Sequence, residues 1–176
     1  MGFLKNIFSG STNETKEAAP SVTINTEANT IYAPFNGTVI SLEEIGDGVF
    51  SSGVLGSGIG MNPEEETVYA PFNGKIIQVA DTKHAIGILS NDNMEVLIHI
   101  GMDTVAMNGK GFNVLVTEGD TVRCGQPLMT FSKKEIANAG YPDTTAIVVT
   151  NSADFEEVSV LTNGPVEKCT PVMLTK

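Results

Sequence analysis

Residues 81–105 read DTKHAIGILSNDNMEVLIHIGMDTV and contain both histidines of the chain, His84 and His99. Two runs within this stretch, residues 85–89 and 96–100, are rich in aliphatic and β-branched residues, which favour strands. A short polar segment separates the two runs, as in a turn. The stretch therefore predicts a hairpin-like pair of strands with one histidine beside each strand.

The second of these strands has two chemically different faces, because successive side chains of a strand point to opposite sides. One face is wholly apolar, which is typical of a core. Its residues are Val96, Ile98 and Ile100. The other face holds Glu95, Leu97 and His99 and is expected to meet solvent or a partner. Gly101 follows, where the missing side chain lets another group approach the backbone. On spacing alone, His99 is either a structural residue or a reactive one.

The composition favours a single all-β domain. Val, Ile, Thr and Gly are plentiful, Trp is absent, and turn residues recur at short intervals in the 176 residues. The net charge is −11, and the sequence shows no basic stripe able to bind nucleic acid. The N-terminus does not resemble a signal peptide, and no apolar run is long enough to cross a bilayer. We expect a cytoplasmic protein in which Cys124 and Cys169 are reduced thiols.

Two segments of the chain repeat each other: residues 31–40 read IYAPFNGTVI, and residues 68–77 read VYAPFNGKII. Each copy reads as a strand, a turn that starts at Pro and closes with Asn-Gly, and a second strand. Architectures built by stacking repeats need three or more copies, whereas this chain has two. The repeat therefore predicts a pseudo-twofold β-sandwich, of the barrel-sandwich hybrid type, with one or two short helices.

The rest of the chain predicts further short strands and one helix. The strands cover residues 112–116, 127–131, 146–150 and 171–174. The helix covers Ser132–Ala139, with Ser132 as its N-cap, Glu135 at the capping-box position and Gly140 as its stop.

Residues 46–58, between the two copies of the repeat, predict a loop with many glycines. They match neither a dinucleotide-binding fingerprint nor a P-loop, so nucleotide binding is not expected. Four large apolar residues occur in this loop: Val49, Phe50, Val54 and Leu55. Their side chains either tuck into the core or form an exposed patch that marks an interaction site.

The first 21 residues differ in character from the rest of the chain. In Met1–Phe8 the large apolar residues fall on one helical stripe, and residues 9–21 are a polar segment typical of a flexible linker. Such a leader either docks weakly on anionic lipid through residues 1–8 or is a frayed terminus. We predict that the folded domain covers residues 22–176.

Several motifs follow one another from about Ile31 through Thr150: VYAPFNGKI, TKHAIGI, EVLIHIGMDTV, GKGF, EGDTV, GQPL and GYPDTTAIVVT. Together they resemble the glucose-type enzyme IIA family of the bacterial phosphoenolpyruvate-dependent sugar phosphotransferase system. The leader MGFLKNIF is also similar to that of free-standing members. Three positions depart from the family's usual pattern: Ala80 and Leu97 stand where aromatic residues are common, and Asn93 stands where a Gly is usual. We therefore expect an apolar rim and a turn of different shape.

The resemblance implies an all-β sandwich in which the two histidines face each other across adjacent strands. It also implies a phosphotransferase component, in which Nε2 of His99 accepts a phosphoryl group from the phosphocarrier protein HPr. His99 would then pass the group to a cysteine of a sugar-specific IIB domain. A neutral imidazole near pH 7 supplies the lone pair that this chemistry needs. His84 would hydrogen-bond the phosphoryl oxygens and stabilise their charge, and Thr82 would hold the His84 ring.

The same resemblance assigns roles to residues around the two histidines. Asp47 and Asp103 would flank the site and meet the arginines of HPr, although each also fits a turn-forming aspartate. An apolar collar would exclude water and bind partners. Its residues are Val49, Phe50, Val54, Leu55, Leu97 and Val105. No cofactor is required, but His84 and His99 would bind zinc where a partner adds a carboxylate. The same face would also bind regulatory target proteins.

Two other classes of protein share this kind of β architecture. Lipoyl- and biotinyl-carrier domains need a lysine at a hairpin tip, and the chain contains neither Met-Lys-Met nor Asp-Lys-Ala. Zinc peptidases need about three protein ligands for each metal ion, and the chain has no His-x-His. The alternative function that stays open is a zinc-binding or protein-binding sandwich module without phosphotransfer.

Overall fold

The computed structural model describes residues 24–176. The predicted leader and linker, residues 1–21, lie outside the described residues, as does the expected membrane contact of residues 1–8. Within residues 24–176, no helix has the length and apolar character needed to cross a bilayer.

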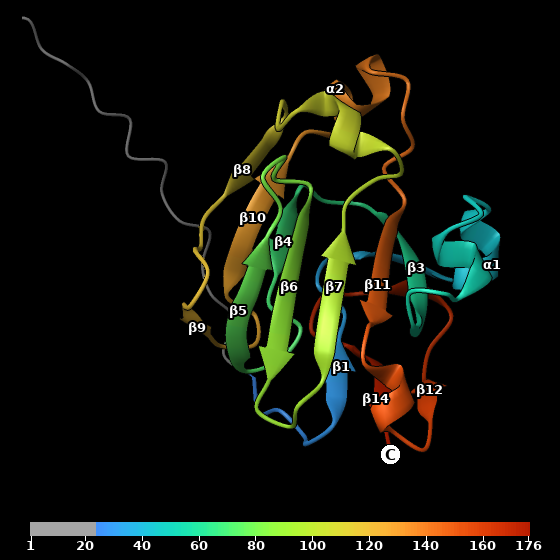
Figure 1. Cartoon of the computed structure of the whole chain (residues 1–176), viewed down its shortest axis with the longest axis vertical. Coiled ribbons are helices and arrows are strands. Elements are labelled where there is room, and N and C mark those ends of the chain that lie inside the picture. The colour runs from blue at the N-terminus through green and yellow to red at the C-terminus, as the bar shows by residue number, and fades with distance from the viewer. Residues whose placement is uncertain (1–23) are drawn as a thin grey trace, which may run out of the picture.

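The protein is a sandwich of antiparallel sheets (Figure 1). The largest sheet has eight strands, which in spatial order are β13 (Gly164–Val166), β2 (Gly37–Ser41), β3 (Ser57–Pro63), β11 (Thr145–Val149), β7 (Glu95–His99), β6 (Ala85–Ser90), β5 (Gly74–Val79) and β9 (Thr121–Val122). Two three-stranded sheets lie behind it in this view. One contains β1 (Thr30–Tyr32), β14 (Pro171–Thr175) and β12 (Val158–Val160), and the other contains β4 (Thr67–Tyr69), β10 (Pro127–Phe131) and β8 (Phe112–Val114).

The main hydrophobic core is shared by the large sheet and the two smaller ones. Ile59 on β3 and Ile98 on β7 belong to the same cluster as Leu128 on β10 and Val172 on β14, and all four side chains are fully buried. Burial of each such side chain contributes about 1.5–3 kcal/mol. The expected all-β sandwich is therefore confirmed, whereas the described sheets do not close into a barrel.

The two copies of the repeat pack against each other as pseudo-twofold mates. The backbone N–H of Tyr32 donates to the carbonyl of Pro71 at 2.9 Å. Tyr69, the matching residue of the second copy, donates to the carbonyl of Pro34 at 2.8 Å. This reciprocal exchange confirms the pseudo-twofold arrangement predicted from the repeat.

Each copy of the repeat also has a glycine at a point where two strands come very close. A Cβ atom on Gly37 would lie 2.3 Å from the carbonyl oxygen of Asn62. A Cβ atom on Gly74 would lie 2.2 Å from the carbonyl oxygen of Leu89. The glycine of each Asn-Gly pair is therefore required by strand packing, in addition to its place in the turn.

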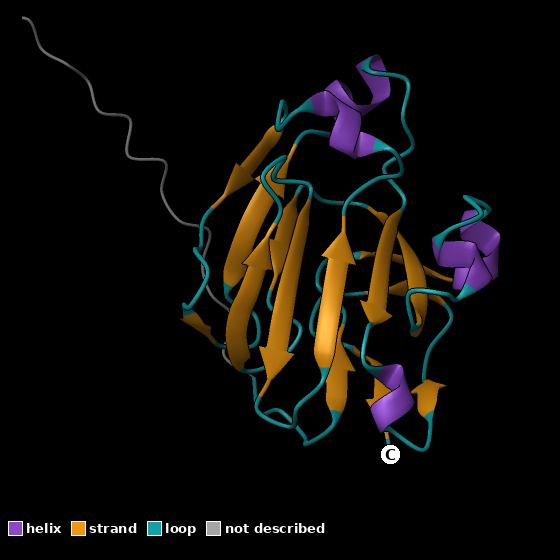
Figure 2. Cartoon of the chain, viewed as in Figure 1, coloured by secondary structure: helices purple, strands orange, loops and turns teal. Residues whose placement is uncertain are grey.

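The helical segments lie around the edges and ends of the sheets (Figure 2). They are α1 (Leu42–Ile45), α2 (Lys133–Asn138) and the 3₁₀ turns η1 (Phe50–Ser52), η2 (Thr104–Met107) and η3 (Ser152–Asp154). The helix predicted over residues 132–139 is thus confirmed as α2, whereas Glu135 does not complete the predicted capping box, because the backbone N–H of Ser132 donates to the carbonyl of Gly111. Its N-cap is Ser132, whose hydroxyl accepts the N–H of Glu135 at 3.2 Å, and Gly140 follows it in the left-handed conformation with φ 85°.

The prediction of one loop over residues 46–58 was wrong at its end, because β3 begins at Ser57. Gly58 and Gly60 weaken the strand signal in the sequence. The fold nevertheless requires them, since a Cβ atom on Gly58 would lie 2.1 Å from the carbonyl oxygen of Ile147. A Cβ atom on Gly60 would lie 2.7 Å from the side chain of Ile40. Tight packing against the neighbouring strands therefore explains why this central strand was missed.

Several boundaries also differ from the prediction. The strand expected over residues 112–116 ends at Val114, and the one expected over 146–150 covers Thr145–Val149. Strands β12 and β13 and helix α1 were not predicted.

Helix α1 starts with a capping box, in which Ser41 Oγ accepts the N–H of Glu44 at 3.3 Å and the Glu44 carboxylate accepts the N–H of Ser41 at 2.8 Å.

We predict that Gly74→Ala destabilises the protein by about 2 kcal/mol or more, because overpacking against a rigid backbone carbonyl costs about 1–3 kcal/mol. Gly87→Ala is the matched control in the adjacent strand β6, where the added Cβ would lie 3.2 Å from the Gln78 side chain. Urea unfolding gives the free energy of unfolding of each variant. Equal stability of the two variants would contradict the close approach at Gly74.

Candidate active site

The two histidines meet at the same end of the β6–β7 hairpin. Strand β6 begins at Ala85, directly after His84, and β7 ends at His99. The backbone N–H of Ile100 donates to the carbonyl of His84 at 2.8 Å and so extends the pairing of the strands. The two imidazole rings lie edge to face, with centroids 4.6 Å apart and planes at 83°. The hairpin therefore brings both rings to one place, as the sequence predicts.

Small residues beside His99 make room for its ring. Ala85 of β6 and Ala146 of β11 are the cross-strand partners of His99 on its two sides. Both alanines are buried, so a larger side chain at either position would press on the imidazole. Ala146 was not predicted as part of the site, because the pairing of β11 with β7 cannot be read from the local sequence.

The tautomer of His99 follows from a single contact. Nδ1 of His99 lies 2.8 Å from the carbonyl oxygen of Gly101. A carbonyl oxygen only accepts hydrogen bonds, so Nδ1 carries the proton and donates it. In the neutral ring Nε2 is then left with a free lone pair. Gly101 reaches this position with φ 71°, in the left-handed region that favours glycine.

The His84 ring is held by a neighbouring hydroxyl. Oγ1 of Thr82 lies 2.7 Å from Nδ1 of His84. When the hydroxyl donates to Nδ1, the neutral His84 ring carries its proton on Nε2 and can act as a donor there. His84 is almost fully buried, so this contact fixes a ring with little freedom to turn.

A second, smaller hydrophobic cluster covers the outer face of the large sheet beside His99. Its buried members are Phe50, Met102, Ala146 and Val148, and Leu42, Ile45 and Leu97 pack against them. The Phe50 ring lies 4.9 Å from the His99 ring, centroid to centroid, with the planes tilted by 57°. Phe50 therefore tucks in against the imidazole, while the rest of the segment from α1 to η1 covers the neighbouring strands.

The other apolar residues of the predicted collar are exposed. The exposed fractions are 49% for Val49, 76% for Val54, 40% for Leu55 and 52% for Val105. Leu97 is half-buried and packs in the second cluster. The two interpretations of the glycine-rich loop thus apply to different residues: Phe50 is buried, whereas Val49, Val54 and Leu55 are exposed.

The two aspartates of the predicted site differ in their contacts. The carboxylate of Asp47 accepts the backbone N–H groups of Phe50 at 3.1 Å and Ser51 at 3.0 Å. Burial opposes ionisation of Asp47, but the hydrogen bonds from Ser51 and Phe50 outweigh it and lower its pKa. Asp47 is therefore an ionised residue that holds the turn containing Phe50. Asp103 is exposed and adopts the left-handed conformation, with φ 61°, before η2.

Burial keeps both imidazoles neutral at pH 7. Burial and, to a smaller extent, the adjacent His84 ring lower the pKa of His99 to about 4, against the opposing effect of the hydrogen bond to Gly101. Burial also lowers the pKa of His84. A neutral His99 with a protonated Nδ1 has a nucleophilic Nε2 at physiological pH.

The described residues do not complete a metal site by themselves. Among residues 24–176, no cluster of three or more His, Cys, Asp or Glu side chains is placed to hold a metal ion. His84 and His99 would supply two of the four ligands that zinc usually takes. Zinc at this pair therefore stays a prediction for a complex in which a partner adds a carboxylate.

Cys124 is buried, which raises its pKa to about 12 and makes it a poor nucleophile.

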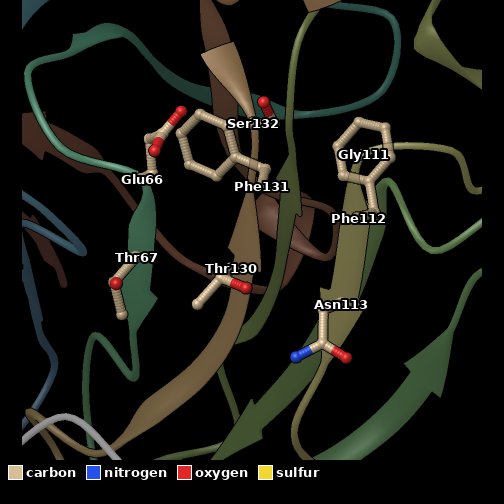
Figure 3. A pocket seen from close by; sticks show the side chains of 8 residues that line it. All are labelled: Glu66, Thr67, Gly111, Phe112, Asn113, Thr130, Phe131 and Ser132. Atoms are coloured by element: carbon tan, nitrogen blue, oxygen red, sulfur yellow. The ribbon is translucent and has the colours of Figure 1, made fainter. Parts of the chain in front are cut away.

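A hollow of about 480 Å³ lies away from the histidines (Figure 3). It lies over the sheet of β4, β10 and β8, where Thr67, Thr130 and Asn113 stand side by side on paired strands. Its remaining polar side chains already bond to the chain, since Glu66 accepts the N–H of Lys133 and Ser132 caps α2. The two histidines lie elsewhere, with His84 almost fully buried and His99 half-buried.

We predict that the low pKa of His99 makes the fold less stable in acid. An unfolded histidine titrates near pH 6.5, so between that value and the folded pKa of about 4 the unfolded chain binds more protons. The free energy of unfolding should therefore fall as the pH drops through this window. Urea unfolding between about pH 7 and about pH 4.5 measures the effect, and His99→Gln should remove this part of the pH dependence. The same pH dependence in both proteins would contradict the assignment.

Comparison with known proteins gives the same family as the motifs of the sequence. Residues 29–155 match the family model described as phosphoenolpyruvate-dependent sugar phosphotransferase system, EIIA 1. The chain is 42% identical over 130 residues to the glucose-specific EIIA component of Staphylococcus epidermidis, which covers 74% of this chain and 78% of that protein. The solved structure of glucose permease IIA from Mycoplasma capricolum matches with a TM-score of 0.76 and 34% identity, over 82% of this chain and 93% of that chain.

Other relatives are much longer than this chain. The beta-glucoside-specific EIIBCA component of Dickeya chrysanthemi is 40% identical over 170 residues, which are 91% of this chain but 27% of that protein. The chain thus spans about a quarter of the length of that relative. The family match, the identities and the shared fold agree with one another. The chain therefore belongs to the EIIA 1 family of the phosphoenolpyruvate-dependent sugar phosphotransferase system, whose members are phosphotransferase components.

Proposed function

We propose that this protein is a cytoplasmic phosphoryl carrier, which accepts a phosphoryl group from phospho-HPr on Nε2 of His99 and passes it to a cysteine of a IIB domain. The observation that supports this most directly is the 2.8 Å contact of Nδ1 with the Gly101 carbonyl, which leaves the lone pair of Nε2 free. In each transfer the bond from phosphorus to the donor atom breaks as the bond to the acceptor atom forms. The chain's task is to position and stabilise the group.

His84 is the second reacting-site residue in this proposal. Its ring lies 4.6 Å from that of His99, so a donor on Nε2 of His84 lies close to the oxygens of a phosphoryl group on His99. Thr82 supports this role when its hydroxyl donates to Nδ1 of His84 at 2.7 Å. A fixed donor aimed at the transferred charge stabilises the transition state more than a mobile water molecule does.

The surface around the histidines suits a protein partner. The exposed side chains of Val49, Val54, Leu55 and Val105 would pack against HPr or IIB and exclude water from the phosphoryl group. Asp47 and Asp103 would meet basic side chains of HPr at the edge of this surface. The Dickeya chrysanthemi relative is named an EIIBCA component, which supports a IIB domain as the acceptor.

The same surface offers a route to regulation. A phosphoryl group on His99 adds about −1.5 to −2 charges to a surface that is otherwise largely apolar. A target protein that binds the apolar surface would therefore bind the phosphorylated form more weakly. We include such target proteins in the proposal. Their binding would follow the supply of sugar, because that supply would change the fraction of this protein that is phosphorylated on His99.

Transfer of labelled phosphate from phosphoenolpyruvate, through enzyme I and HPr, tests the proposal. Wild type should acquire an acid-labile, base-stable phosphate, and His99→Ala should acquire none. His84→Gln should still accept phosphate but pass it to IIB about 10²-fold more slowly, as expected for loss of one transition-state donor. Absence of label on wild type from a competent HPr, or label on His99→Ala, would refute the carrier role.

The same assay tests the apolar surface with one matched pair of variants. Val54→Asp places a charge at a site that is 76% exposed in the loop just after η1, and Val160→Asp does so at a site that is 52% exposed on β12. Val54→Asp should raise KM for HPr by about five- to tenfold, because it removes partner binding and leaves the chemistry intact. Val160→Asp should leave KM unchanged. An equal change in KM for the two variants would mean that HPr binds a different surface of the protein.

A further inference from the structure

Thr104 is a fully buried polar residue close to His99 that none of the roles above uses. It lies at the start of η2, three residues after Gly101. Its side chain has 0% exposure, and its hydroxyl donates to the carbonyl of Ile100, the residue directly after His99. A buried hydroxyl is costly unless it is bonded, and the bond to the Ile100 carbonyl satisfies it.

The hydrogen bond from the Thr104 hydroxyl to the Ile100 carbonyl is one of two contacts that fix the turn at Gly101. On the other side, the backbone N–H of Met102 donates to the carbonyl of Pro142 at 3.2 Å. The peptide groups before and after Gly101 are thus each fixed by a contact from outside the turn. Between these contacts, Gly101 is enclosed: a Cβ atom there would lie 2.4 Å from Cγ2 of Thr104 and 2.9 Å from the Pro142 oxygen.

We infer that Thr104 is a positioning residue, which holds the Gly101 carbonyl in line with Nδ1 of His99 and so fixes the reactive tautomer. The inference rests on the proposed function only for its effect on phosphoryl transfer. Its effect on the imidazole of the free protein is independent of that function. Thr104 acts through the backbone of residues 100 and 101, since its hydroxyl bonds the Ile100 carbonyl.

The physical reason is that the tautomer of a histidine is set by the hydrogen bond at its other nitrogen. A hydrogen bond weakens steeply when its angle departs from linear, so a small rotation of the Gly101 peptide would weaken the bond from Nδ1. Without that bond, a neutral imidazole prefers to carry its proton on Nε2. A ring in that form has no lone pair on the nitrogen that is proposed to accept the phosphoryl group.

The test compares Thr104→Val, which keeps the shape but loses the hydroxyl, with Thr104→Ser, which keeps the hydroxyl. Thr30→Val is the matched control, since Thr30 is also buried and its hydroxyl also donates to a backbone carbonyl, that of Ala28 at 3.1 Å. Long-range ¹H–¹⁵N NMR of the histidine rings reports the tautomer of His99 in the unphosphorylated protein. The phosphoryl transfer assay with HPr reports kcat and KM.

Thr104→Val should shift part of His99 to the Nε2–H tautomer and lower kcat by about tenfold with little change in KM, a smaller loss than the ~10²-fold that a 1 Å misplacement can cause. Thr104→Ser should restore most of the wild-type tautomer, and Thr30→Val should leave the His99 spectrum unchanged. If Thr104→Val does not fold, Thr104→Ala takes its place in the comparison with Thr104→Ser.

The inference is overturned if the hydroxyl-free variants keep the wild-type tautomer of His99, whatever their stability. It is also overturned if Thr30→Val changes the spectrum equally, since Thr104 would then act through general stability. A changed tautomer in a protein whose wild type takes no phosphate from HPr would uphold the positioning role and refute the carrier function. The two claims can therefore fail separately.

Discussion

The hydrogen bond from Nδ1 of His99 to the carbonyl of Gly101 decides which nitrogen of the neutral ring keeps a free lone pair. Most of the surrounding structure can be understood as the means of making that bond. The β6–β7 hairpin places His99 at the end of a strand, and the left-handed Gly101 turns the chain so that its carbonyl points back to the ring. Burial then keeps the ring neutral, so that the nitrogen opposite the bond has its lone pair at physiological pH.

The site depends on β11 and β7 being packed on both faces. Ile98 and Ile147 face the main core, while Leu97 and Val148 face the second cluster with Phe50. The main core fixes the strands, and the second cluster covers the neighbouring part of the outer face. His99 thus sits at the end of a rigid strand, and under the proposed function the exposed part of the collar is left for a partner protein.

Much of this arrangement could be predicted because it is encoded locally. The alternation around His99 gives the face of β7, the two APFNG segments give the pseudo-twofold sandwich, and Ser132 with Gly140 gives both ends of α2. The missed features depend on contacts between distant segments. Strand β3 is hidden by glycines that its neighbours require. The placement of Ala146 beside His99 follows from strand register, which one sequence does not reveal. The roles predicted for Asp103 and for the apolar collar depend on contacts with partner proteins, so they remain predictions.

The most direct test of this account is the position of the phosphate on the phosphorylated protein. ³¹P and ¹⁵N NMR of the protein labelled through HPr distinguishes the two ring nitrogens and the two histidines. The account predicts a single phosphohistidine, with phosphorus bonded to Nε2 of His99 and a proton retained on Nδ1. Phosphate on Nδ1 of His99, or on His84, would contradict it, because the bond to Gly101 would then not determine the reactive nitrogen.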